Sequence, residues 1–430
     1  MGTVKANTRT SRWLLLQSRQ RGDAYNLSHN FLSFIVDIFI NPLRRIFLPY
    51  LSYNVDKSIY SAATVVIFTR SKRTLEKICL RLWRRFSNDL CDAQSMARHF
   101  EYVREGLEIN RKFAPGVYLG VACVKRPKPN WNKVTEWREV ERGKLITNPI
   151  WNIMAEQYEW TGNIEYAFVM KCLPQSWRLD NQLQSKKLAN ERSMRFLAQE
   201  IAYMHKNLET SKQAMGTPQG IQSKLNLNLS LLQSILPHVH CDIKQKENYK
   251  HLINIMKKAY IYFIPSFNER YKNSHIKRCH GDLKAANLWI RPAFTWPWHW
   301  SIGTKRFKKQ LLALDCIDFN AKFCNIDTLS DIAMLAIDIE MYLMNYNCIE
   351  SAVHLVGCFL TTYLERVGED SQQVQPLLEY YLTEKAIVCA CISVLYEKNA
   401  GRAKKYLDVA MAHAKKLQAS FASCKQEGTV

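Results

Sequence analysis

The sequence predicts an α+β protein in which a small mixed lobe precedes a larger lobe made mostly of helices. Two observations predict this class. Before residue 175, short β-branched and apolar stretches typical of strands surround a single long helical pattern. After that point apolar residues recur mainly at helical spacing, so helices segregated from the strands are expected rather than a doubly wound sheet.

The predicted small lobe covers residues 61–175. A β-branched run within residues 62–68 is typical of a strand. Apolar residues at helical spacing within residues 92–112 predict a long helix that ends before Pro115. Further strands are expected at residues 78–83, 117–124 and 164–173.

The predicted large lobe covers residues 176–420. A helix is expected at residues 190–207. The residues that follow, 210–228, are rich in Ser, Asn, Gln and Gly and are expected to form a loop or a lobe boundary. The remainder of the chain, to about residue 417, has helical periodicity wherever it is apolar. The exceptions are two short strands around residues 288–290 and 311–319.

Composition limits the class of protein more than its function. The chain has 430 residues, of which 47% are hydrophobic and 23% charged, a balance typical of a globular protein. Its formal net charge of +22 predicts attraction to an anionic partner, but nucleotide, nucleic acid and acidic lipid all fit. The 13 cysteines include no C-x-x-C pair, which favours reduced thiols and a cytoplasmic protein.

Residues 1–60 are basic and rich in aromatic side chains, and they are expected to form an extension of unknown role. The apolar stretch 31–40 within them is too short to span a bilayer. Peripheral contact with a membrane surface through this extension remains open. Residues 294–309, which combine tryptophans with cations, could stack on nucleic-acid bases, but packing under the lobe is the favoured interpretation.

The residues that carry chemistry lie in the run from His280 to Asn287. Transfer of a phosphoryl group from ATP needs a carboxylate that orients the acceptor hydroxyl, oxygen ligands for Mg²⁺ and a cation near the phosphate. Asp282 is the candidate base, Lys284 the candidate cation, and Asn287 a candidate magnesium ligand. The next apolar run is expected to bring Asp318 to the same metal, with Asp315 as the alternative ligand.

This pattern resembles the aminoglycoside phosphotransferase and choline kinase branch of the protein-kinase-like superfamily, which carries H-G-D in its catalytic loop. It is most similar to the bacterial phosphotransferase domain that is often fused to a P-loop ATPase. The chain contains no G-x-x-x-x-G-K-[ST] run, so the ATPase half is absent. The similar stretches fall within residues 80–420 and comprise residues 107–121, 276–287, 315–333 and 403–410.

The resemblance implies a protein-kinase-like two-lobe fold with ATP and Mg²⁺ as cofactors. By the same resemblance Asp282 is the base, Asn287 and Asp318 hold the metal, and Asp331 is a structural residue that braces the catalytic loop. The resemblance also implies a hinge that binds adenine through its backbone, formed by Met170, Lys171, Cys172 and Leu173.

Two positions depart from the family pattern on the ATP side of the site. Arg81 stands in the stretch where the family carries lysines that contact the ATP phosphates, and its planar guanidinium is not equivalent to a compact ammonium. Gly106 stands where the partner glutamate is expected, with Glu105 beside it. The favoured function is a phosphotransferase acting on a hydroxyl or amino group of an unidentified small molecule. The first alternative is a weak pseudokinase that binds nucleotide or serves as a scaffold. The second is a nucleic-acid or membrane-surface binder that uses the basic N-terminus and residues 294–309. The acceptor and the oligomeric state are not encoded in any recognisable motif.

Overall fold

The computed structural model describes part of the chain, and all structural statements below concern that part. The described residues are 53–60, 64–71, 77–84, 86–87, 91–125, 137–142, 164–292, 309–320, 323–345 and 349–427. The apolar stretch 31–40 and nearly all of the tryptophan-rich segment 294–309 lie outside these residues. Of the latter segment, Lys309 is described, and its ammonium lies 4.3 Å from the ring centre of Phe196.

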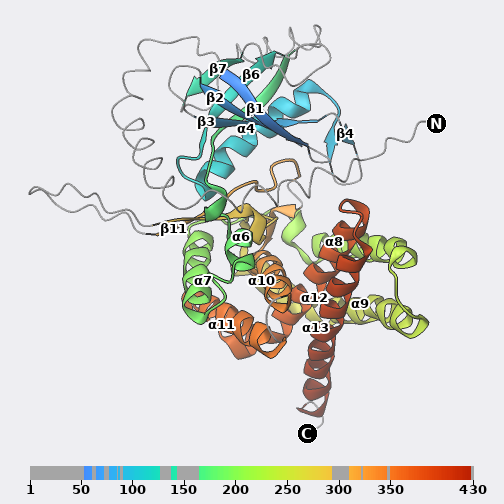
Figure 1. Ribbon diagram of the computed structural model, residues 1–430. Helices are drawn as coiled ribbons and strands as arrows, with labels where there is room; N and C mark the ends of the chain where they lie inside the picture. Colours follow the sequence, from blue (N-terminus) through green and yellow to red (C-terminus); the bar gives the residue numbers. More distant parts are fainter. Residues whose placement is uncertain are drawn as a thin grey trace, which may run out of the picture.

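An antiparallel sheet forms the N-terminal part of the molecule (Figure 1). In the described residues its strand order is β1-β2-β3-β8-β6-β7. The strands are β1 (Tyr53–Tyr60), β2 (Thr64–Ser71), β3 (Lys77–Trp83), β6 (Tyr118–Lys125), β7 (Trp137–Arg142) and β8 (Ile164–Lys171). Four of them lie within a few residues of the predicted strands, because β-branched and apolar residues mark each one.

Strand β1 pairs with β2 along its whole length, from Tyr53 opposite Ser71 to Tyr60 opposite Val65. The sheet therefore begins before residue 61, and the boundary expected between an extension of residues 1–60 and the small lobe is too late. The polar sequence of β1, Tyr-Asn-Val-Asp-Lys-Ser-Ile-Tyr, explains why it does not stand out as a strand. As the edge strand of the sheet it needs few apolar side chains.

Helix α4 (Met96–Phe113) packs against one face of the sheet. It starts at Ser95, whose hydroxyl accepts a hydrogen bond from the backbone amide of Arg98, the usual way of satisfying the first turn. Its buried residues Phe100, Val103 and Leu107 recur every three to four positions and share one hydrophobic cluster with side chains of β3, β6 and β8. The helix therefore has one fixed orientation on the sheet, which matters for the site below.

The C-terminal part is built from helices around one hydrophobic core, so the predicted α+β class with a mixed N-terminal part and a helical C-terminal part is confirmed (Figure 1). The helices are α6 (Leu179–Gln184), α7 (Glu191–Lys206), α8 (Pro218–Ile235), α9 (Ile243–Lys272), α10 (Thr328–Met344), α11 (Ile349–Val367), α12 (Ser371–Leu395) and α13 (Ala400–Glu427).

Helix α8 contradicts the loop expected at residues 210–228. Thr217 caps its first turn and Pro218 occupies the first helical position, where a proline is tolerated. The polar residues that suggested a loop lie mainly on the solvent face, whereas Ile221, Leu225 and Leu229 are buried at a spacing of four. Composition concealed this periodicity, and only residues 210–217 remain largely irregular.

Two short antiparallel strand pairs carry the functional motifs. Strand β9 (Ile276–Arg278) pairs with β12 (Asn325–Asp327), and β10 (Leu288–Arg291) pairs with β11 (Gln310–Ala313). The strand expected to run to residue 319 is wrong in its second half, because β11 ends at Ala313. Asp315 adopts a positive φ of 64° and turns the chain out of the strand direction.

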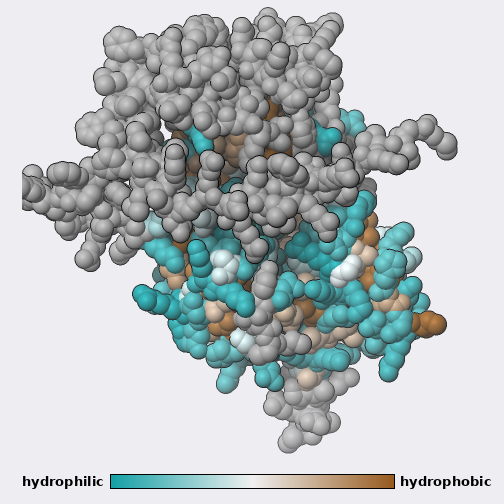
Figure 2. Space-filling model, viewed as in Figure 1, coloured by the Kyte–Doolittle hydropathy of each residue, from teal (hydrophilic) through white to brown (hydrophobic). Residues whose placement is uncertain are grey.

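Among the described residues, no helix combines the length and the apolar character needed to cross a membrane. Figure 2 shows a mainly hydrophilic surface over the described helices of the C-terminal part, with hydrophobic side chains scattered between them.

Candidate active site

The loop from His280 to Asn287 connects β9 to β10 and is shaped by Gly281. This glycine has a φ of +82°, a conformation that other residues rarely adopt. A Cβ atom at this position would lie 2.6 Å from the carbonyl oxygen of Phe323, so a larger residue is excluded on steric grounds as well. The glycine of the H-G-D motif is therefore required by the backbone, independently of any chemistry.

Asp331, in the first turn of α10, braces this loop as expected. Its carboxylate is fully buried and accepts hydrogen bonds from the backbone amides of His280 (3.1 Å) and Gly281 (3.0 Å). The Nε2 atom of His205 lies 3.3 Å from the same carboxylate. Burial alone would raise the pKa of Asp331, but these contacts outweigh it and the pKa lies below its usual value. The loop is thus fixed to a buried anion.

His205, Cys279 and Asp331 form the one group of three His, Cys, Asp or Glu side chains in the described part of the chain whose ligand atoms lie within 4.8 Å of one another. Their polar atoms are already engaged, since Nδ1 of His205 lies 2.7 Å from the hydroxyl of Tyr363 and its Nε2 faces Asp331. Burial also raises the pKa of the Cys279 thiol well above its usual value, which disfavours the thiolate that a metal needs. We interpret the group as part of the brace.

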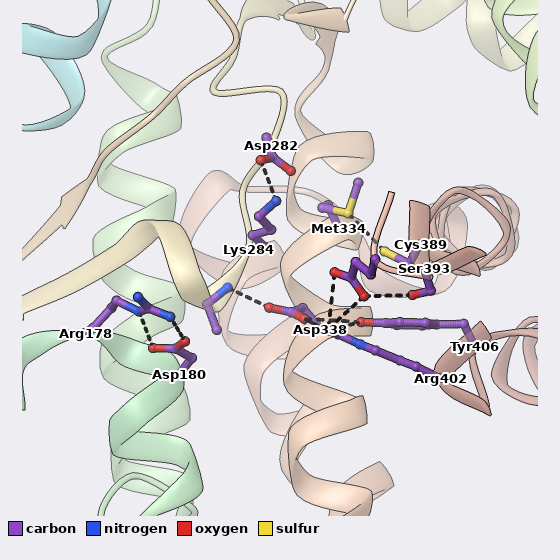
Figure 3. Close-up of polar contacts among 12 residues, drawn as sticks. Arg178, Asp180, Asp282, Lys284, Met334, Asp338, Cys389, Ser393, Arg402 and Tyr406 are labelled. Carbon is purple, nitrogen blue, oxygen red and sulfur yellow. Dashed lines mark hydrogen bonds and ion pairs between the residues drawn. The ribbon is translucent and has the colours of Figure 1, made fainter. Parts of the chain in front are cut away.

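The three candidate residues of the loop are in direct contact. The ammonium of Lys284 lies 2.8 Å from Oδ2 of Asp282, and Nδ2 of Asn287 donates to the same oxygen at 2.9 Å (Figure 3 shows the first contact). The side chain of Asp282 is 27% exposed and that of Lys284 39% exposed, so both are accessible to a ligand. Burial opposes ionisation of Asp282, but Lys284 outweighs it, and the pKa of Asp282 lies below its usual value. Asp282 is therefore an anion at neutral pH.

A second buried carboxylate supports the loop, and it is not among the site residues predicted from the sequence. Asp338 on α10 is buried and accepts a hydrogen bond of 2.7 Å from the backbone amide of Ala285. Its other oxygen faces the hydroxyl of Tyr406 (3.4 Å) and the guanidinium of Arg402 (4.0 Å), both on α13 (Figure 3). Asp338 follows Asp331 by two helical turns, so the two lie on one face of α10, and this spacing is the signal that could have revealed it.

The β10–β11 pair joins the loop to the segment that contains Asp315 and Asp318. The backbone amide of Leu314 donates to the carbonyl of Asn287 at 2.8 Å, and that of Ile317 donates to the carbonyl of His280 at 3.0 Å. The two amides between them bond to side chains of the N-terminal part. The backbone amide of Asp315 donates to the Tyr118 hydroxyl, and that of Cys316 donates to Oδ1 of Asn110 on α4. Both parts of the molecule thus position this segment.

Arg81 on β3 forms ion pairs with both aspartates of this segment. One guanidinium nitrogen lies 2.6 Å from Asp315 and another lies 3.4 Å from Asp318. The side chain of Asp315 is 49% exposed, whereas Asp318 is fully buried. Burial raises the pKa of Asp318 to about 7, against the opposing effect of Arg81. For Arg81 burial works against the charge, but the two carboxylates prevail and raise its pKa above the ordinary value.

Gly106 on α4 makes room for this arrangement. A Cβ atom at position 106 would lie 2.4 Å from Oδ2 of Asp318, 2.8 Å from the ring of Phe168 and 2.9 Å from Cβ of Asp318. Any side chain there would displace Asp318 from its contact with Arg81. Asp318, from the segment after β11, fills the space in which a glutamate side chain of α4 is expected.

The expected hinge residues lie at the end of β8. Met170 pairs with Cys79 of β3, and the amide of Lys171 donates to the carbonyl of Val117 at 3.0 Å. Because it already makes this bond, the Lys171 amide is not available as a donor to adenine. Cys172 and Leu173 follow the last strand residue and are both half-buried.

Three oxygen-bearing side chains, one on the loop and two on the segment after β11, have the ligand chemistry of a magnesium site. Asp315, Asp318 and Asn287 offer carboxylate and amide oxygens, the hard ligands that Mg²⁺ accepts. Oδ1 of Asp318 is buried without a hydrogen-bond partner, and the amide nitrogen of Asn287 faces Asp282, so its Oδ1 is directed away from that residue. An additional cation at this point would satisfy an otherwise uncompensated buried oxygen.

No protein-family model matches the chain, and no curated protein matches its sequence. Solved structures similar to it include an ethanolamine kinase of Plasmodium vivax, with 11% identity and a TM-score of 0.40 over 98% of this chain and 95% of that one. A glucosamine kinase has 11% identity and a TM-score of 0.40 over 86% of this chain and 95% of that one. The function proposed below rests on the geometry of the site.

Proposed function

We propose that the chain is a phosphotransferase that moves the γ-phosphate of ATP to a hydroxyl or amino group of a small molecule, with Mg²⁺ as cofactor. The observation that carries this proposal is the cluster of Asp282, Lys284 and Asn287 on a loop held by buried carboxylates. An accessible carboxylate beside an ammonium and an amide is the set of groups that phosphoryl transfer needs on the acceptor side.

Asp282 accepts the hydrogen bond of the acceptor hydroxyl in this proposal. Its low pKa keeps it ionised, so it orients the hydroxyl and receives its proton late in the reaction. Lys284 has two roles, because its ammonium holds Asp282 in place and adds positive charge beside the transferred phosphoryl group.

We assign the two aspartates different roles on the basis of their exposure. Asp315 is half-exposed and follows directly after the amide that pairs with Asn287, so it is the better candidate for the metal. Asp318 is buried and fills the space at Gly106, so its Oδ2 serves to hold Arg81 toward the phosphates, while its unpartnered Oδ1 stays available as a second ligand for the metal. Bound Mg²⁺ would neutralise phosphate charge, while the protein supplies orientation through Arg81, Lys284 and Asp282.

The decisive experiment compares Asp282→Asn with the unmodified protein. ATP turnover is measured against a panel of amino alcohols, sugars and aminoglycosides. We expect turnover to fall by about 10²–10⁴-fold, the usual contribution of a positioned acid–base group. Asp370→Asn is the matched control, because this exposed carboxylate caps α12 and asparagine caps equally well. Unchanged turnover in the Asp282 variant, with the fold intact, would exclude the assignment.

The second candidate function is a nucleotide-binding pseudokinase, which the Arg81 ion pairs favour. Arg81 already compensates Asp315 and Asp318, so the site is partly neutralised without a divalent ion. Thermal unfolding with ATP, with Mg²⁺ and with both separates the two candidates. A ligand at a hundredfold excess over its Kd stabilises by about 2.7 kcal/mol. The pseudokinase would be established if ATP stabilised the protein without Mg²⁺ and no Asp282-dependent turnover were found.

A further inference from the structure

Two thiols meet at the junction of β3 and the expected hinge. The Sγ atoms of Cys79 and Cys172 lie 2.8 Å apart. The register of the sheet explains the contact. Cys79 is opposite Met170, and Cys172 follows Met170 by two residues, so all three side chains lie on the same face of the sheet.

The distance between the two sulfur atoms is close to that of a covalent bond. A disulfide bond is about 2.05 Å long, so the sulfur atoms would need to approach by less than about 1 Å. Cys79 is 7% exposed, whereas Cys172 is half-buried and is the thiol that a reagent reaches first. The pair therefore combines an accessible thiol with a buried thiol that can resolve a mixed disulfide.

The pair also lies beside the proposed nucleotide site. Cys79 precedes Arg81 by two residues on β3, so its side chain lies on the same face of the strand as the guanidinium that contacts Asp315 and Asp318. Cys172 belongs to the segment expected to contact adenine. A covalent bond between them would join the strand that carries the phosphate-binding cation to the hinge.

We propose that Cys79 and Cys172 form a reversible disulfide bond that closes the adenine side of the nucleotide site. The effect on nucleotide binding rests on the proposed function, but formation of the bond does not. The bond draws the hinge against β3 and shortens the gap into which a base would enter. Oxidation therefore weakens nucleotide binding, and reduction restores it.

The chemistry is thiol–disulfide exchange with a low-molecular-weight disulfide, RSSR, as the oxidant. The thiolate of Cys172 attacks one sulfur of RSSR, breaks its S–S bond and releases RS⁻, which takes up a proton. Cys79, having lost its proton, then attacks Sγ of Cys172 in the mixed disulfide and releases the second RS⁻. Two protein thiols and one RSSR become one protein disulfide and two RSH, so atoms and electrons balance.

Peptide mapping of the full chain tests bond formation without reference to nucleotide. The protein is incubated with oxidised glutathione, its remaining thiols are blocked, and it is digested with trypsin without a reductant. Cleavage after Lys77, Arg81, Lys171 and Arg178 releases the peptides Ile78–Arg81 and Cys172–Arg178. We expect a linked pair that is two hydrogen atoms lighter than the sum of the two peptides. Absence of this pair, or its appearance only in urea, overturns the proposal.

Nucleotide affinity before and after oxidation tests the consequence. We expect ATP to bind about tenfold or more weakly to the oxidised protein, with recovery after dithiothreitol. Cys172→Ser removes this sensitivity, whereas Cys358→Ser, at a half-buried cysteine on α11, retains it. Sensitivity that persists in Cys172→Ser overturns the proposed effect. A linked peptide pair in a protein that binds no nucleotide in either state would instead contradict the proposed function and leave the disulfide standing.

Discussion

The loop that carries Asp282 and the strand that carries Arg81 hold their charged groups by different means. The loop is fixed through its backbone, because Asp331 and Asp338 accept hydrogen bonds from its amides. Arg81 is fixed through its side chain, by ion pairs with two carboxylates of a different segment. A ligand can therefore replace the partners of Arg81 without disturbing the loop.

This difference indicates where the molecule can respond to nucleotide. The carboxylates that brace the loop are buried, whereas Asp282 and Lys284 are partly exposed, so we expect the backbone of the loop to keep its position with or without a ligand. In the proposed function, phosphate would compete with Asp315 for Arg81, and a cation would compete with Arg81 for Asp315. The three predictions that follow test this comparison, beginning with the brace.

Asp331→Ala is expected to have the largest effect. It leaves the buried amide of His280 and the part-buried amide of Gly281 without an acceptor, at a cost of up to about 1–3 kcal/mol for each. Turnover should be lost as well, because the loop no longer holds Asp282 in place. Urea unfolding and turnover are measured beside Asp370→Ala, which removes an exposed helix cap and should cost about 1 kcal/mol. If the two variants were equally stable, the loop would not depend on its brace.

Gly106→Ala tests the other side of the comparison. The added methyl group would lie 2.4 Å from Asp318 and 2.8 Å from Phe168, so the helix or the aspartate must move. We expect a loss of about 1–3 kcal/mol, typical of an overpacked core. We also expect weaker nucleotide binding, since Arg81 loses the support of Asp318.

Gly357→Ala provides the matched control for this variant. Gly357 is an exposed residue within α11, and a Cβ atom there would meet no other atom within 4 Å. Alanine should therefore stabilise the protein by about 1 kcal/mol through helix propensity alone. If Gly106→Ala stabilised the protein to the same extent, the packing of Asp318 against α4 would not matter.

The sequence predicted the loop better than it predicted the Arg81 cluster, for a physical reason. His280, Asp282, Lys284 and Asn287 are neighbours in the chain, and a short loop brings them together whatever the rest of the fold does. Arg81 and Asp318 are 237 residues apart, and their contact depends on the packing of β3, α4 and the segment after β11. The sequence showed a missing glutamate at Gly106 but could not show what fills its space.

Prediction of the secondary structure from the sequence was also incomplete. α4 and α7 have clear apolar faces and were expected within a few residues of their positions. α8 was missed because its solvent face is rich in residues typical of loops. Strand β1 was missed because an edge strand needs little apolar sequence. Local patterns predict elements that bury one continuous face, and they fail where polar residues dominate the exposed face.

The last prediction concerns a buried charge in the helices that support the loop. His413 on α13 lies between two buried carboxylates, with Nδ1 2.6 Å from Glu379 and Nε2 3.0 Å from Glu340. Lys416 also approaches Glu379, at 3.9 Å. Burial opposes protonation of His413, but the hydrogen bonds to both glutamates outweigh it and raise its pKa to about 9.

The sign of the pH dependence follows from this shift. The ordinary pKa of histidine is about 6.5, so between pH 6.5 and pH 9 the folded protein keeps a proton that the unfolded chain has lost. The stabilising contribution is complete below about pH 6.5 and is lost as the pH rises through about 9, with a slope of at most about 1.4 kcal/mol per pH unit. His413→Gln should flatten this slope in urea unfolding, whereas His240→Gln, at an exposed histidine, should leave it unchanged. An unchanged slope in His413→Gln would mean that the helices under the loop do not depend on this charge.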